Sequence, residues 1–141
     1  MAGDKERFVG EGSPFSEVDD QLIKALWRLT FDVGGEHYSR QIRDEGTIDW
    51  VADGIRRAGI EGRSVADVAA LGLYRIVREH PFVDCNHRTG WLLCRTLMLS
   101  VGFETAVPRT DVIEFVRSID AKELSLDAVE EWVRRSFYRL S

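Results

Sequence analysis

The stretch HPFVDCNHRTG, residues 80–90, runs directly into the apolar segment WLLCRTLMLSV, residues 91–101. Apolar side chains of the second segment fall on nearly every face of a helix, whereas a surface helix shows a single apolar stripe. At about 1.5 Å per residue the segment is too short to cross a membrane, where roughly 20 residues are needed, and Arg95 lies in its middle. We therefore expect a central buried helix.

The first half of this region gathers side chains that suit chemistry on phosphates. Pro81 disfavours helical geometry for the residue before it, so a preceding helix should end at His80 and leave its ring available as a general base. Asp84 is a carboxylate that suits a hard cation such as Mg²⁺, and Arg88 offers a planar fork for phosphate oxygens. Asn86, a favoured N-cap residue, should start the central helix, whose amino terminus favours anions.

The same stretch resembles the signature of the Fic/Doc family, which reads HPFx(D/E)GNGRxxR in adenylyltransferases and HxFx(D/N)ANKRTA in death-on-curing (Doc) toxins. Five residues match both forms: His80, Phe82, Asp84, Asn86 and Arg88. Thr89 with the small Gly90 fits the Doc form better. Segments QIRDEGTI (41–48) and KELSLDAVEEW (122–132) resemble further Doc segments, so the resemblance extends over residues 22–140.

The resemblance implies an all-α Fic/Doc fold of about six helices around a central buried helix, at about residues 86–101. It implies His80 as the catalytic base and Asp84 as the Mg²⁺ ligand. It also implies that ATP, or another nucleoside triphosphate, is bound by Cys85, Asn86, His87 and Arg88. A Doc-like protein transfers a phosphoryl group to a Ser or Thr hydroxyl of a target protein, and elongation factor Tu is the target that the resemblance suggests.

Three residues depart from the family signature. Cys85 replaces Gly or Ala, His87 replaces the Gly or Lys that separates the two branches, and Trp91 replaces the second Arg of adenylyltransferases. We favour the Doc-like reaction, because His87 fills space as Lys does and Trp91 is uncharged. Adenylyl transfer (AMPylation) and a catalytically inactive interaction module with the Fic fold stay open. A metal-dependent hydrolase that uses His80, Asp84 and His87 as ligands is a further alternative.

The sequence also bears on regulation. Self-restrained Fic proteins carry (S/T)xxxE(G/N), whereas here Val18 follows the spacing Ser13 to Glu17 and Thr105 follows the spacing Ser100 to Glu104. We therefore expect inhibition by a separately encoded antitoxin that fills a surface groove.

Composition limits the class of protein. The 141 residues suit one domain, expected over residues 16–141 after a flexible tail at 1–15. A net charge of −5 argues against nucleic acid or an anionic membrane as the main partner. Cys85 and Cys94 match no metal or redox spacing and are expected to be free thiols. Because the amino terminus lacks an apolar signal region, we expect a cytoplasmic protein.

Periodicity and capping residues predict the other elements. Helices are expected at residues 16–33, at 48–58 after Thr47, at 65–79 after Ser64, at 111–119 after Thr110, and from Ser125 to Leu140. The polar segment 36–46 is expected to be a loop. By resemblance it is the flap that holds the target, with His37, Tyr38, Arg40 and Arg43 as contacts, although a solvated connection explains it equally well. Residues 103–109 are expected to be a connection or a brief extended piece, and no strand is predicted.

Overall fold

The structure, a computed structural model, describes residues 15–32 and 38–141. Six α-helices lie in this part of the chain: α2 (Asp20–Leu29), α3 (Glu45–Ile60), α4 (Val65–Glu79), α5 (Asn86–Ser100), α6 (Arg109–Asp120) and α7 (Leu126–Ser136). A 3-10 turn, η2 (Thr30–Asp32), extends α2, and strands β1 (Phe103–Thr105) and β2 (Phe137–Arg139) form a small antiparallel pair. The prediction of an all-α fold with about six helices around a central buried helix is confirmed.

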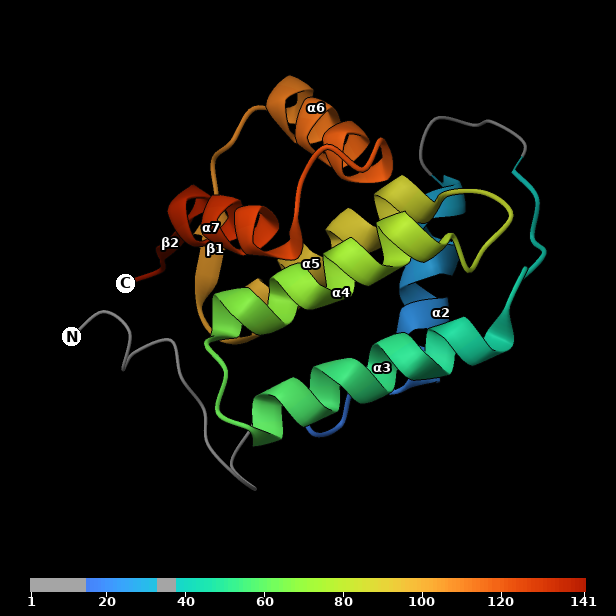
Figure 1. The fold of residues 1–141 in the computed structure, drawn as a ribbon, viewed down its shortest axis with the longest axis horizontal. Coiled ribbons are helices and arrows are strands. Elements are labelled where there is room, and N and C mark those ends of the chain that lie inside the picture. Colours follow the sequence, from blue (N-terminus) through green and yellow to red (C-terminus); the bar gives the residue numbers. More distant parts are fainter. Residues whose placement is uncertain (1–14, 33–37) are drawn as a thin grey trace.

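Helices α4 and α5 lie side by side through the middle of the molecule (Figure 1). α4 also packs on α3, α6 and α7, and α2 packs on α5 and α3. The close approach of α4 and α5 requires glycine, because a Cβ at Gly90 would lie 2.9 Å from Val77 Cγ2. A Cβ at Gly72 would likewise lie 3.1 Å from both Ile55 and Leu93.

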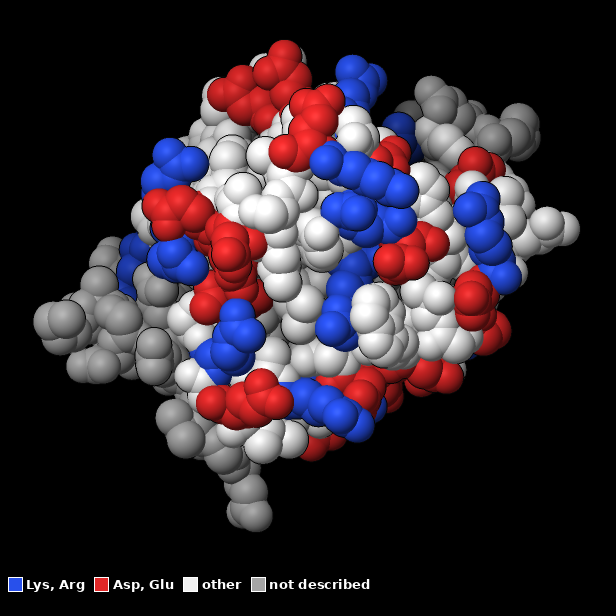
Figure 2. All heavy atoms as spheres, viewed as in Figure 1, with Lys and Arg blue, Asp and Glu red and all other residues white. Residues whose placement is uncertain are grey.

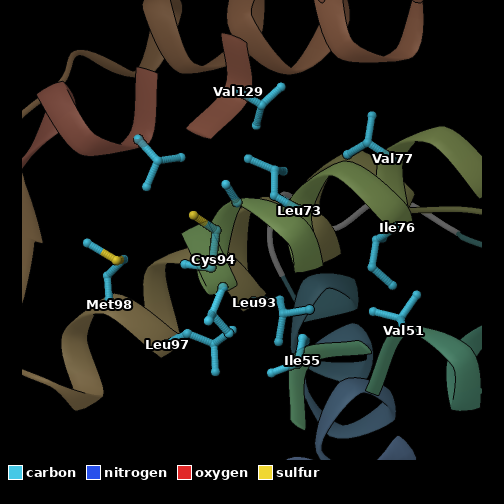
Figure 3. Packing of buried hydrophobic residues seen from close by; sticks show 14 of the residues in the cluster. Val51, Ile55, Leu73, Ile76, Val77, Leu93, Cys94, Leu97, Met98 and Val129 are labelled. Atoms are coloured by element: carbon cyan, nitrogen blue, oxygen red, sulfur yellow. The ribbon is translucent and has the colours of Figure 1, made fainter. Parts of the chain in front are cut away.

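The buried hydrophobic residues form one cluster between these helices. Figure 3 shows Ile55 of α3, Leu73 of α4, Leu97 of α5 and Val129 of α7 converging on it. Burial raises the pKa of the Cys94 thiol, which therefore stays neutral and packs as a small apolar group.

The sequence predicted that α5 is a buried helix with apolar side chains on nearly every face. In the structure, one side of α5 is exposed. Leu99 is 47% exposed, and Arg95 is exposed and pairs with Glu104 of β1 at 2.9 Å. α5 packs on α4, α2 and β1, and Leu93 and Leu97 are among its buried residues.

The caps of two helices are as predicted, and those of the other four, α2, α3, α5 and α6, are not. Ser64 and Ser125 accept hydrogen bonds from the N–H groups three residues on, at the starts of α4 and α7. By contrast, α3 starts earlier than expected because the carboxylate of Asp44, not the hydroxyl of Thr47, caps it. Asp19 likewise caps α2, which begins at residue 20 rather than 16, and Pro108 replaces Thr110 as the cap of α6.

The two ends of the chain differ from expectation in detail. Most of the tail predicted at residues 1–15 lies outside the described residues, as do Val33 and His37, but Phe15 itself is buried in the core. At the other end, residues 137–139 pair with residues 103–105 instead of continuing α7. Leu140, at which the last helix was expected to end, is 46% exposed.

Surface charge and helix length bear on the expected partners. On the face seen in Figure 2, small groups of basic and acidic side chains are interspersed, and neither sign covers the face. Within residues 15–32 and 38–141, no helix has both the length and the apolar character needed to span a membrane.

Candidate active site

His80 lies at the corner predicted for it. It ends α4 in the left-handed conformation, with φ of 50° and ψ of 60°, and its N–H donates to Ile76 O at 3.1 Å. A non-glycine residue in this conformation is uncommon, and histidine is one of the residues that tolerates it. The turn directs the chain into Pro81, and the His80 side chain stays about one third exposed.

The loop after His80 is held by backbone pairing with residues 41–43, inside the predicted flap. Ile42 and Phe82 form an antiparallel bridge. Val83 N donates to Gln41 O at 3.1 Å, and Arg43 N donates to Pro81 O at 2.7 Å. Residues 41–44 of the segment expected to be a loop are therefore held against the signature loop.

Asn86 has a different role from the predicted N-cap. Its side chain accepts from Phe82 N at 3.0 Å and donates to Phe82 O at 2.8 Å, so it closes the loop instead of capping the helix. The cap residue is Cys85, in the left-handed conformation with φ of 68°, and its side chain makes no capping hydrogen bond. Because the thiol does not cap α5, the first N–H groups of this helix receive no side-chain acceptor from that position.

This helix start is suited to an anion. The first turn of α5 contains no acidic residue, and the positive end of a helix favours anions. A pocket of about 320 Å³ opens there. Its lining contains all six predicted site residues, together with Tyr38 and Val83: His80, Asp84, Cys85, Asn86, His87 and Arg88.

Asp84 is anchored on both sides. Its carboxylate accepts from Ser39 N at 2.7 Å, and its backbone oxygen accepts from Trp27 Nε1 at 3.1 Å. A single carboxylate on the wall of this pocket fits Mg²⁺, which binds proteins through one or two carboxylates and completes its shell with water and phosphates. The residues present therefore fit the expected ion.

The structure adds Asp120, the last residue of α6, which was not among the predicted site residues. Asp120 Oδ1 lies 2.6 Å from His80 Nε2, and Oδ2 lies 2.7 Å from His87 Nε2. Thus the third partner of the two histidines is Asp120, and not the Asp84 of the hydrolase alternative. Partial burial acts to raise the pKa of Asp120, but the hydrogen bonds and charges of His87 and His80 outweigh it, and the pKa lies below its usual value.

The family model for the Fic/DOC family matches residues 17–98, more than half of the chain. The chain belongs to the Fic/DOC family. Proteins of this family are generally transferases that bind a nucleoside triphosphate with Mg²⁺, and typically they are toxins with an antitoxin partner. Comparison with curated proteins gave no significant match. The matched range contains the whole signature loop and ends within α5, so Asp120 lies beyond it.

Asp120 gives a stability prediction that depends on pH. Because folding lowers its pKa below the usual 3.8, the carboxylate stabilises the protein above that pH and loses this contribution as the pH falls through the lowered pKa. Asp120→Ala should lower the free energy of unfolding by about 1 kcal/mol at pH 7, a modest value because the site is partly solvated. The difference from wild type should shrink below about pH 4.

Urea unfolding of both proteins from pH 7 to pH 3 measures this difference. Asp111→Ala, which removes an exposed carboxylate at the other end of the same helix, is the control. A difference that stays constant down to pH 3 would contradict the assignment to Asp120.

Proposed function

We propose that this chain is a Doc-like toxin that transfers a phosphoryl group from ATP to a Ser or Thr hydroxyl of a target protein. One observation carries the proposal: the base candidate, the metal carboxylate and an uncapped helix start meet at one pocket. Elongation factor Tu is the proposed target, by resemblance to Doc toxins. The proposed location is the cytoplasm, with which two free thiols, Cys85 and Cys94, are consistent.

The position of each residue in the pocket indicates its role in the proposed reaction. When bound, ATP supplies the transferable phosphate and Mg²⁺ neutralises its negative charge. His80, on the wall of the pocket, accepts the proton of the target hydroxyl. Asp84 holds the metal, while Arg88 and the first N–H groups of α5 hold phosphate oxygens. For His80 to take the proton at Nε2, its hydrogen bond to Asp120 must be released or the ring must turn.

The choice of phosphoryl over adenylyl transfer rests on residues 87 and 91. His87 fills the pocket wall where adenylyltransferases have glycine, and its side chain is 42% exposed. Trp91 packs edge-on against Trp132, with ring centroids 6.0 Å apart, and lies 5.9 Å from the Phe137 ring. A packed indole cannot supply the phosphate contact that the second Arg of adenylyltransferases provides. We therefore favour a nucleotide bound with its γ-phosphate toward His80.

Restoring the adenylyltransferase pattern should change the product. The double variant His87→Gly, Trp91→Arg opens the pocket and adds a cation one turn after Arg88 on α5. We expect a measurable fraction of the modified target to carry a nucleoside monophosphate instead of a phosphate. Intact-mass spectrometry of the target distinguishes the two products.

The control is His87→Gly, Trp91→Leu, which opens the pocket to the same extent and keeps residue 91 apolar. Circular dichroism checks both variants, because Trp91 also packs against α7 and β2. If a folded arginine variant still transfers only phosphate, these two positions do not set the reaction.

A second hollow, of about 610 Å³, supports the proposed antitoxin. It shares His87 and Arg88 with the first pocket and lies between α5 and α6. Val112 and Val116 supply apolar lining, and Arg109 and Arg117 supply positive charge. An amphipathic helix with acidic residues beside its apolar face fits this groove. Because the two hollows share residues, such a helix would also obstruct the nucleotide.

A further inference from the structure

Three side chains from three different helices converge beside the nucleotide pocket. His80 ends α4, His87 lies in the first turn of α5, and Asp120 is the last residue of α6. Each histidine directs Nε2 at a different oxygen of the same carboxylate, at 2.6 and 2.7 Å. One ligand atom from each residue can be chosen so that all three lie within 4.8 Å of one another.

This donor set suits a transition metal better than Mg²⁺. Two imidazoles with one carboxylate and an open position make up a common zinc site, whereas Mg²⁺ prefers oxygen ligands. Asp84, the proposed Mg²⁺ ligand, is not part of the group. The chain therefore presents an oxygen site for Mg²⁺ and, separately, a nitrogen-rich site next to it.

The geometry allows an ion to enter. Ligands bound to Zn²⁺ at about 2.0–2.2 Å in tetrahedral geometry lie roughly 3.4 Å apart, so the present hydrogen-bonded contacts must widen by less than 1 Å. All three side chains are at least one third exposed and have room to move. The adjoining pocket of about 320 Å³, lined by both histidines, leaves space for a water as the fourth ligand.

We propose that His80, His87 and Asp120 bind one Zn²⁺ ion in the nucleotide-free protein. Each imidazole coordinates as the neutral form through the Nε2 lone pair, so the Nε2 proton that faces the Asp120 carboxylate in the ion-free structure moves to Nδ1 or is released to solvent, and Asp120 coordinates as the carboxylate. The ion joins the ends of α4, α5 and α6, so it should also stabilise the fold. Given the proposed function, it occupies the lone pair that His80 needs for the target proton, so zinc inhibits transfer.

The test uses the full chain after a chelator has removed any bound metal. Calorimetry follows a titration with Zn²⁺, and visible absorption follows a titration with Co²⁺. Neither ATP nor target is present. We expect one ion per chain and a higher Tm with zinc. His87→Ala and Asp120→Asn should each weaken binding by more than about 100-fold, because even residues outside a ligand set typically contribute 10–100-fold. Asp111→Asn, at the other end of α6, should bind as wild type does.

Binding that survives both ligand variants, or no saturable binding at all, would overturn the proposal. So would a thiolate band in the Co²⁺ spectrum that Cys85→Ser removes, because the ion would then sit on the cap of α5. The experiments distinguish failure of the zinc site from failure of the proposed phosphoryl transfer. Zinc binding without Mg²⁺-dependent transfer contradicts only the proposed function, and transfer without zinc binding contradicts only this inference.

Discussion

Replacing His80 with alanine is expected to reduce transfer to the target by about 10²–10⁴-fold, the usual contribution of a positioned general base. The side chain is about one third exposed, so its loss leaves no core cavity and the fold should remain intact. Expression of the wild-type chain without an antitoxin should arrest growth, and expression of the variant should not. Transfer from labelled ATP and growth curves measure the two effects.

His80→Gln separates base catalysis from positioning, because glutamine can still hydrogen-bond to Asp120 but cannot accept the proton. It should be as inactive as alanine. A folded alanine or glutamine variant that remains toxic would remove His80 from the mechanism. Absence of any growth defect on wild-type expression, in cells that carry the target, would count against the toxin assignment.

Replacing Phe82 with alanine should lower the free energy of unfolding by about 3–5 kcal/mol. Phe82 is fully buried, and its ring stacks on Trp27 with centroids 4.4 Å apart. Its backbone is held by the Asn86 side chain and by the bridge to Ile42. The loss is a large share of the 5–15 kcal/mol typical of a domain. Transfer should fall as well, because the loop that carries Asp84 loses its anchor.

Urea unfolding measures this effect, and the neighbouring Val83 provides the control. Val83 is 38% exposed in the same loop, so Val83→Ala should change stability by less than about 0.5 kcal/mol. If the two variants lose similar stability, Phe82 does not anchor the loop.

The sequence predicted the elements whose signals are local. Ser64 and Ser125 cap the helices expected to follow them, because each hydroxyl needs only an N–H group three residues away. The corner at His80 followed from Pro81. Asn86 was wrongly predicted as a cap, because its side chain turns back to Phe82 and leaves Cys85 at the cap position. The residue types alone favour Asn86 as the cap, and only the loop geometry shows that its side chain is bound to Phe82 instead.

Asp120 shows what local reasoning missed. It follows His87 by 33 positions in the chain, and packing of α6 onto α4 and α5 brings it to the site. One signal was available: a carboxylate at the end of a helix opposes the helix dipole unless a cationic or donor group compensates. The pairing of residues 103–105 with 137–139 also depends on contacts between distant parts of the chain. Because periodicity reports only local patterns, it wrongly predicted residues 137–139 as a continuation of α7.

The most direct test of the central claim uses ATP labelled at the γ-phosphate or at the α-phosphate. Each is incubated with Mg²⁺, purified elongation factor Tu or an extract of the cells that the chain arrests, and either wild-type protein or His80→Ala. We predict that a target protein gains γ label with the wild-type chain, and that the variant transfers none. Transfer of α label would make the enzyme an adenylyltransferase. Equal labelling by wild type and variant, from either position, would contradict the claim that His80 drives the reaction and would favour an inactive interaction module.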